Sequence, residues 1–284
     1  MAQHPVDVSG HTVKSYDQEL ARVRGQLLEM GGLVEDQIGW AVKALVAPDL
    51  AVVDQVFARH PRIRDTATGI DRACTHIIAR RQPMGRDLRM LLASIKTAGE
   101  LSNIAEEAHK IARMVHRLYH SSPSSPALGL FRGVADSARQ ATVMVRGCLD
   151  AFARGDPEHA QWVIDQDDEL DDLYHAAMAH LTALMTEDRS VVHHAVDVVF
   201  IHKSLEHIGD HAKTIAEHVV GLLQGPNPNA QDPSPASNLP SKPWPLPISE
   251  GAATGGDTPQ RKRNSKPAAS KYAVSVSRSA RVSG

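Results

Sequence analysis

Apolar residues recur at three- and four-residue steps along most of this chain, and that spacing places them on one face of an α-helix. The run from residue 200 to residue 220 shows the pattern most clearly. Its apolar positions are Ile201, Leu205, Ile208, Ala212, Ile215, Ala216 and Val219. The same spacing predicts six long helices, over residues 15–46, 49–81, 87–119, 130–154, 157–186 and 190–223. Pro61 falls inside the second helix, where we expect a kink or a short break.

The helical pattern occurs twice along the chain. Aligning Ile104 with Ile208 sets residues 98–112 beside residues 203–216 in the same hydrophobic register. A repeat with a period of roughly a hundred residues indicates duplication of a whole subdomain, because solenoid repeats are much shorter. Short connections within each half favour antiparallel packing. We therefore expect an all-α fold of two tandem, sequence-related three-helix bundles.

Changes in composition divide the chain further. The C-terminal part holds ten of the 17 prolines and the basic cluster 261–266. It is too poor in apolar residues to offset the entropy lost on ordering, so we expect a disordered basic tail. The expected segments are a mobile leader at 1–14, a first bundle at 15–120, a Ser/Pro-rich linker at 121–129, a second bundle at 130–224 and the tail at 225–284.

Composition also bounds the class of protein. Only 4% of the residues are aromatic, which favours helices packed on helices over a β-sandwich. Cys74 and Cys148 each lie in an apolar helical pattern and read as buried thiols of a reducing compartment. The sequence shows no signal peptide and no apolar run long enough to cross a bilayer. We therefore expect a cytoplasmic protein.

Two pairs of carboxylates carry the candidate chemistry. Glu206 and Asp210 are four residues apart, and so are Asp167 and Asp171. If their two helices pack antiparallel, the four side chains face one another and offer hard oxygen donors. Such a set suits a divalent or iron-type metal, for example Fe, Mn, Mg or Zn. Acidic runs on helices are also common as solvated faces, so spacing alone leaves both interpretations open.

Other functional classes find little support. The 16 histidines form no His-Glu-x-x-His zinc motif, and no nucleophile elbow or phosphate-cradling glycine loop is present. We therefore expect no enzyme. A nucleic-acid binder is disfavoured because the tail lacks interleaved aromatic residues and the body is acidic. The alternative is a ferritin-like bundle for metal storage or redox chemistry. It would need inward-facing Glu-x-x-His pairs in a four-helix core, and the acidic face carries none.

Several motifs add a resemblance. Met30–Glu35, Ile70–Pro83, Asp87–Arg89 and Ser204–Asp210 together resemble the PhoU family over residues 15–222. The resemblance implies a cytoplasmic regulator that represses the phosphate-starvation response when phosphate is plentiful. Its implied partners are the ATPase subunit of the phosphate ABC transporter and a PhoR-type sensor histidine kinase, with membrane contact only through them. It also implies a homodimer and metal bound at Glu/Asp-x-x-x-Asp pairs.

The first repeat departs from that metal pattern. His60 and Arg64 stand where the second repeat has Asp167 and Asp171, while Ser102 and Glu106 stand where it has Glu206 and Asp210. Arg64 puts a fixed positive charge where a cation would sit. We therefore expect metal in the second bundle alone, at Asp167, Asp171, Glu206 and Asp210.

Overall fold

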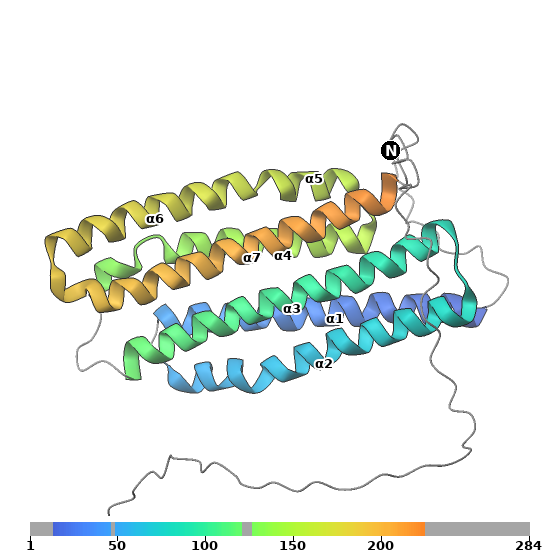
Figure 1. Ribbon diagram of the computed structural model, residues 1–284, viewed down its shortest axis with the longest axis horizontal. Coiled ribbons are helices and arrows are strands. Elements are labelled where there is room, and N and C mark those ends of the chain that lie inside the picture. The colour runs from blue at the N-terminus through green and yellow to red at the C-terminus, as the bar shows by residue number, and fades with distance from the viewer. Residues whose placement is uncertain (1–13, 47–48, 121–126, 225–284) are drawn as a thin grey trace, which may run out of the picture. The chain divides into compact units, whose positions relative to one another are not determined.

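The computed structural model describes residues 14–46, 49–120 and 127–224, and it contains helices without any strand in those ranges (Figure 1). Residues 1–13 of the leader expected at 1–14, the linker residues 121–126 and the tail at 225–284 lie outside the described residues. The α-helices are α1 (Lys14–Val46), α2 (Leu50–Arg81), α3 (Gly85–His120), α4 (Val134–Arg154), α5 (Pro157–Asp165), α6 (Asp167–Glu187) and α7 (Val192–Gln224). Two short 3₁₀ turns, η1 (Leu128–Phe131) and η2 (Arg189–Val191), precede α4 and α7.

Beyond shifts of one or two residues at helix ends, the structure differs from the sequence-based expectation at three points. The helix expected over 157–186 divides at Gln166, whose carbonyl accepts a hydrogen bond from the Gln140 side chain of α4 at 3.3 Å. The helix expected from residue 130 begins only at Val134, because Gly133 adopts a left-handed conformation with φ of 83°. Of the kink or short break expected at Pro61, the break was wrong, because α2 continues through this residue. Pro61 is exposed, so its ring faces solvent.

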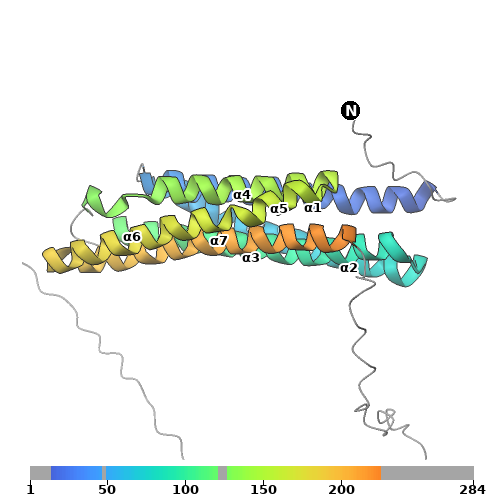
Figure 2. The same ribbon diagram turned by 90° about the horizontal axis from the view of Figure 1, so that it is seen from above.

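The helices form two units that share a core. Figures 1 and 2 show α2, α3, α7 and α6 side by side as one layer, with α1 and α4 packed behind it. Helices α3 and α7 lie next to each other at the middle of this layer and join α1–α3 to α4–α7. All seven apolar positions expected to face the core in residues 200–220 are fully buried. The expectation of two tandem three-helix bundles is thus confirmed, with the middle helix of the second bundle divided into α5 and α6.

Two further expectations concern the state of the two cysteines and the absence of membrane-spanning helices. Cys74 and Cys148 are free and buried, and burial raises the pKa of both thiols, that of Cys74 to about 11. Both are therefore protonated, weakly reactive core residues. None of the helices in the described ranges is long and apolar enough to span a membrane.

Candidate functional site

The four carboxylates singled out in the second repeat lie on the facing sides of α6 and α7. Asp167 is the first residue of α6 and is only 6% exposed, while Asp171 stands one turn further along and is half-buried. From α7, Glu206 is half-buried and Asp210 exposed. Asp167 influences the charge of both Asp171 and Asp210. The four carboxylates therefore form one electrostatic cluster, but among the described residues Asp167 and Asp171 belong to no group of three or more ligand atoms within 4.8 Å of one another.

Two lysines of α7 share this cluster with the carboxylates. The Lys213 Nζ donates to Asp167 Oδ2 at 2.5 Å, and the Lys203 Nζ donates to both oxygens of Glu206 at 2.7 and 2.8 Å. The hydrogen bond to Asp167 is the main cause of the raised pKa of Lys213. We call the surface formed by these four carboxylates on α6 and α7 the acidic face. It contains two lysine charges, and each pairs with one of the carboxylates.

The remaining negative charge is only partly compensated. Burial raises the pKa of Asp171 above its ordinary value, and the charges of Asp167 and Glu206 raise it further. Burial also raises the pKa of Asp210, with Glu206 and Asp167 as the next causes. Like charges at short range disfavour ionisation unless a cation intervenes. Two lysines are therefore too few to neutralise the four carboxylates.

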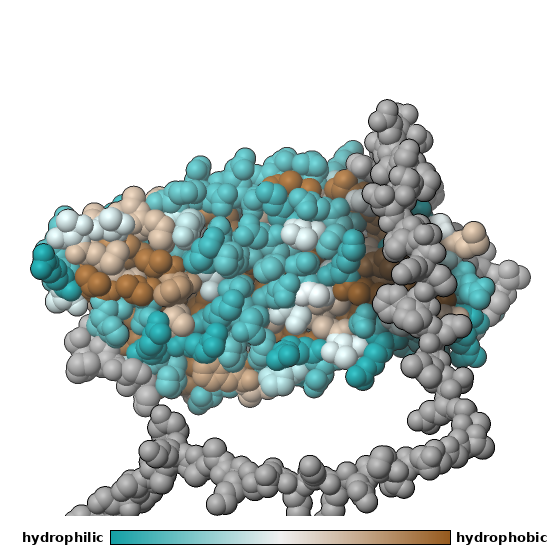
Figure 3. All heavy atoms as spheres, viewed as in Figure 1, coloured by the Kyte–Doolittle hydropathy of each residue, from teal (hydrophilic) through white to brown (hydrophobic). Residues whose placement is uncertain are grey.

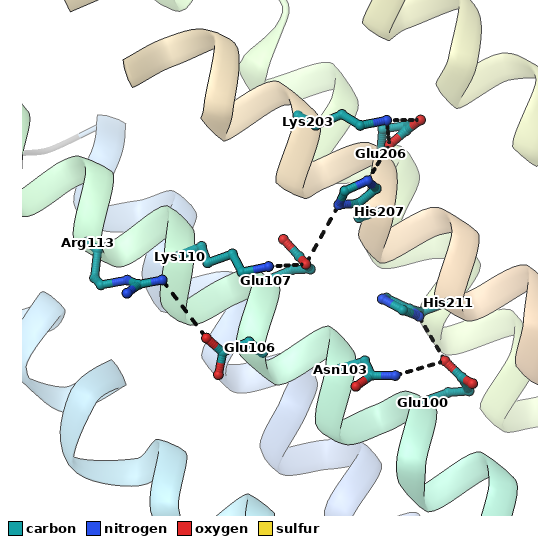
Figure 4. A network of polar contacts seen from close by, with 10 residues as sticks. All are labelled: Glu100, Asn103, Glu106, Glu107, Lys110, Arg113, Lys203, Glu206, His207 and His211. Atoms are coloured by element: carbon teal, nitrogen blue, oxygen red, sulfur yellow. Dashed lines mark hydrogen bonds and ion pairs between the residues drawn. The ribbon is translucent and has the colours of Figure 1, made fainter. Parts of the chain in front are cut away.

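A histidine that the spacing did not select belongs to the same surface. Ligand atoms of Glu206, His207 and Asp210 all lie within 4.8 Å of one another. His207 also reaches across to α3, where its Nδ1 lies 3.7 Å from Glu107 Oε1 (Figure 4). Carboxylates with one imidazole suit borderline metals such as Zn²⁺, Mn²⁺ or Fe²⁺. The donor set therefore fits the class of metal expected from the sequence, in competition with the lysines.

The sequence contained signals for these additions. Lys203 lies three residues before Glu206, and Lys213 three residues after Asp210, so both share the acidic face of α7. His207 follows Glu206 directly and lies three residues before Asp210, so it shares this face of α7 as well. The histidines of this helix were expected to be mostly exposed or half-buried, with a metal role for His207 or His211 as an alternative. Spacing could therefore have found the lysines and His207, and only the contact of His207 with Glu107 depends on α3 passing beside α7.

The equivalent surface of the first bundle is built differently. His60 is 7% exposed, and its Nε2 lies 3.1 Å from Glu106 Oε2. Its ring contacts His109, with 4.7 Å between the ring centroids. Arg113 approaches the other oxygen of Glu106 at 3.9 Å (Figure 4). Glu106 and His109 form the one Glu-x-x-His pair in this groove, which the sequence reasoning overlooked, and an arginine already neutralises its carboxylate.

A polar seam connects the two bundles between α3 and α7. Glu107 is 6% exposed and accepts a hydrogen bond from Lys110 at 2.7 Å. His211 of α7 contacts Glu100 of α3 at 2.8 Å (Figure 4). Figure 3 shows that hydrophilic side chains cover most of the middle of this face. The seam and the acidic face therefore form one continuous polar surface over α6, α7 and α3.

Comparison with known proteins agrees with this architecture. The family model described as PhoU domain matches residues 27–115 and again 134–219. The chain is 38% identical over 215 residues to the phosphate-specific transport system accessory protein PhoU homolog of Pseudomonas putida, covering 76% of this chain and 83% of that one. It is 36% identical over 215 residues to the Pseudomonas aeruginosa protein of the same name, covering 76% and 88%.

Two solved structures resemble the fold. The crystal structure of PhoU from Pseudomonas aeruginosa matches with a TM-score of 0.71 and 37% identity over 74% of this chain and 99% of that one. The phosphate transport system regulatory protein PhoU from Streptococcus pneumoniae matches with a TM-score of 0.65 over 73% and 96%, and its 20% identity supports the fold alone. Two domain matches, one in each bundle, and extensive identity show that the chain belongs to the PhoU family.

Proposed function

We propose that this protein is an accessory regulator of phosphate uptake and signalling. It couples the ATPase subunit of the phosphate ABC transporter to a PhoR-type sensor histidine kinase and represses the phosphate-starvation response when phosphate is plentiful. The observation that carries the proposal is the identity to accessory proteins of the phosphate-specific transport system over 215 residues, which includes both bundles. The role is non-catalytic and cytoplasmic, and the protein reaches the membrane through its partners.

The polar surface over α6, α7 and α3 is suited to partner binding. Charged and half-buried side chains there sit on rigid helices, so their positions are fixed before a partner arrives. Fixed charges of this kind favour fast and selective association. We propose that the transporter subunit and the kinase use this face, and that the protein acts as a homodimer.

Deletion of the gene tests the regulatory role. In phosphate-rich medium the deletion strain should express a phosphatase reporter at the level that the parent strain reaches only under phosphate starvation. A plasmid copy of the full chain should restore repression. Unchanged reporter expression in the deletion strain would count decisively against the assignment. Pull-down of the transporter ATPase and of the kinase by the full chain, with light scattering for its oligomeric state, tests the partners.

We further propose that the acidic face binds a divalent or iron-type cation through Asp167, Asp171, Glu206 and Asp210, with His207 as an additional ligand. The support is the group of Glu206, His207 and Asp210, whose ligand atoms lie within 4.8 Å of one another, together with the burial and the neighbouring carboxylates that raise the pKa of Asp171 and Asp210. A bound cation would neutralise these side chains and hold α6 against α7.

Paired variants test the metal proposal. Asp171→Asn with Glu206→Gln should abolish manganese uptake, measured by metal analysis of protein purified without a histidine tag. Glu106→Gln, the matched change in the first bundle, should leave uptake nearly intact because His60 and Arg113 already occupy that carboxylate. Equal loss from both changes would show that the two bundles do not differ in this respect.

A further inference from the structure

The two ends of the α3–α7 seam are equivalent under the internal repeat of the sequence. Different side chains lie between the helices at each end. Contacts between Arg117 and Asp197 at one end and between Arg89 and Leu222 at the other show that the two helices run antiparallel. With Ile104 aligned to Ile208, each residue of α3 has an equivalent in α7. Each end therefore combines the N-terminal half of one helix with the C-terminal half of the other, and the ends can be compared position by position.

At the first end a charged pair fills the space between the helices. Arg117 of α3 forms an ion pair with Asp197 of α7, which is only 2% exposed. Arg117 also contacts the Met114 sulfur at 3.2 Å. The arginine–aspartate pair thus occupies this end of the seam.

At the second end the equivalent residues are too small to fill the space. Ala93 stands at the position of Asp197, and Gly221 at the position of Arg117. A cavity of about 280 Å³ opens there. Its lining residues are Arg89, Leu92, Ala93, Lys96, Glu217, His218, Gly221 and Leu222. The loss of one arginine–aspartate pair therefore accounts for the hollow.

The charges around this hollow favour an anion. The Arg89 Nε donates to the Leu222 carbonyl at 3.3 Å, which fixes the guanidinium at the rim. Within the described residues, no ion pair engages the other nitrogens of Arg89 or the amine of Lys96. Lys96 follows Arg89 by two helical turns, so the two side chains extend from the same face of α3. The single lining carboxylate, Glu217, leaves an excess of positive charge.

The interior of the hollow differs from its rim. Leu92, Ala93 and Leu222 provide apolar wall, and Leu92 is 46% exposed. The site therefore offers two cations and an apolar wall to the same occupant.

We propose that this hollow between α3 and α7 binds a phosphate ester that carries an apolar group. A phosphate monoester has nearly two negative charges at neutral pH and can accept from both an arginine and a lysine, which a carboxylate matches less well. Inorganic phosphate would leave the wall formed by Leu92 and Leu222 in contact with water. A neutral apolar molecule would leave the positive charges of Arg89 and Lys96 without a negatively charged partner. Soluble phosphate esters and phospholipid headgroups share the chemistry that this site recognises.

A closed variant provides the sharpest test. Ala93→Asp with Gly221→Arg copies the charged pair of the other end into the hollow and leaves the net charge unchanged. A Cβ on Gly221 meets no atom within 4 Å, so the helix accepts the new side chain. The variant also keeps the basic cluster 261–266, so any nonspecific attraction of anions to that cluster is the same in both proteins. Unchanged thermal melting by circular dichroism serves as the folding control.

Phenyl phosphate is the probe, titrated into the full chain and followed by ligand-observed NMR. We expect saturable binding at one site, with at least about tenfold weaker affinity in the closed variant and in Lys96→Gln. Inorganic phosphate and phenol should each bind at least about fivefold more weakly than phenyl phosphate, since each lacks one half of the recognition. Equal affinity of the wild type and the closed variant would overturn the proposal, and so would phenol binding as tightly as the ester.

A vesicle arm identifies the source of the ester. Sedimentation with vesicles of phosphatidylcholine containing phosphatidic acid, compared with phosphatidylcholine alone, reports binding to a lipid headgroup. Sedimentation that the closed variant loses assigns the site to a phospholipid, whereas phenyl phosphate binding without sedimentation assigns it to a soluble ester. Absence of both overturns the site. None of these readouts depends on phosphate regulation in the cell, so the site and the proposed function can fail separately.

Discussion

The two bundles share a hydrophobic register but carry opposite charge. Residues 14–120 contain 16 Lys or Arg and 13 Asp or Glu, a net charge of +3, whereas residues 127–224 contain 7 and 16, a net charge of −9. The buried positions of α3 and α7 coincide, as Ile104 and Ile208 do, while the polar positions diverge. The two copies therefore keep most of their buried apolar positions, while the surface chemistry of each copy differs, since a core tolerates only residues of suitable size and polarity.

The two bundles carry different side chains at equivalent positions of the fold. Lys213 pairs with Asp167 in the second bundle, and at the equivalent positions of the first bundle His109 contacts His60. A charged pair in one copy is thus an aromatic contact in the other. The first bundle has few uncompensated charges here, whereas the second retains an excess of carboxylates that a lysine or a metal can balance.

The largest effect should follow from breaking the closed end of the α3–α7 seam. Arg117→Met leaves the carboxylate of Asp197, which is 2% exposed, without its partner. We expect a loss of about 3 kcal/mol in the free energy of unfolding, measured by urea denaturation. The exposed pair between Arg113 and Glu106 is the control, and Arg113→Met should cost less than about 0.5 kcal/mol. Similar losses from the two changes would show that burial does not distinguish them.

Acid should destabilise the protein through a histidine that only the second copy has. Burial lowers the pKa of His202 to about 4, and the equivalent residue of the first copy is Ala98. The unfolded chain takes up a proton near pH 6.5, while the folded chain does so only near pH 4. Stability should therefore fall as pH drops from about 6.5 to about 4, by about 2–3 kcal/mol in total.

The histidine's share of this loss can be isolated with one variant. His202→Ala should flatten the pH dependence over that interval, even if the cavity it creates lowers stability at neutral pH. Urea denaturation at several pH values gives both quantities. A difference between wild type and variant that stays constant from pH 7 to pH 4 would contradict the assignment.

Removing the two lysines should increase the net negative charge of the acidic face. Lys203→Met with Lys213→Met leaves Glu206 and Asp167 without their lysine partners. If the acidic face binds metal, manganese affinity should rise by about tenfold, equivalent to about 1.4 kcal/mol. Isothermal titration calorimetry measures it, and Lys110→Met, outside the acidic face, is the control. Unchanged affinity in the double variant would indicate that the lysines do not compete for this site.

A smaller effect on stability should follow from a difference in helix packing between the two copies. A Cβ on Gly209 would lie 2.3 Å from Leu170 Cδ2, whereas the equivalent residue of the first copy is the buried Ala105. Gly209→Ala should therefore destabilise by about 1 kcal/mol, because overpacking outweighs the gain in helix propensity. Gly99→Ala, where a Cβ meets nothing within 4 Å, should stabilise by about 0.5 kcal/mol. Thermal melts of both variants make the comparison, and stabilisation by both would refute it.

Much of this protein could be predicted from its sequence because helical periodicity is a local signal. The apolar spacing gave the long helices to within a few residues and showed that they recur in two copies. The misjudged points depend on tertiary structure. The helix divides at Gln166, whose carbonyl accepts a hydrogen bond from Gln140, 26 residues away, and α2 continues through Pro61, which faces solvent.

The sequence by itself determined the fold class, the repeat, the four carboxylates and the loss of three of them from the first copy, since each depends on residue identity and spacing within a helix. The tertiary structure decided which groups from other helices meet them. Only the passage of α3 beside α7 sets Glu107 near His207 and pairs Arg117 with Asp197. The same passage leaves the hollow at Ala93 and Gly221. Contacts between helices depend on how far apart and in which direction the helices run, and periodicity within one helix carries no information about its neighbour.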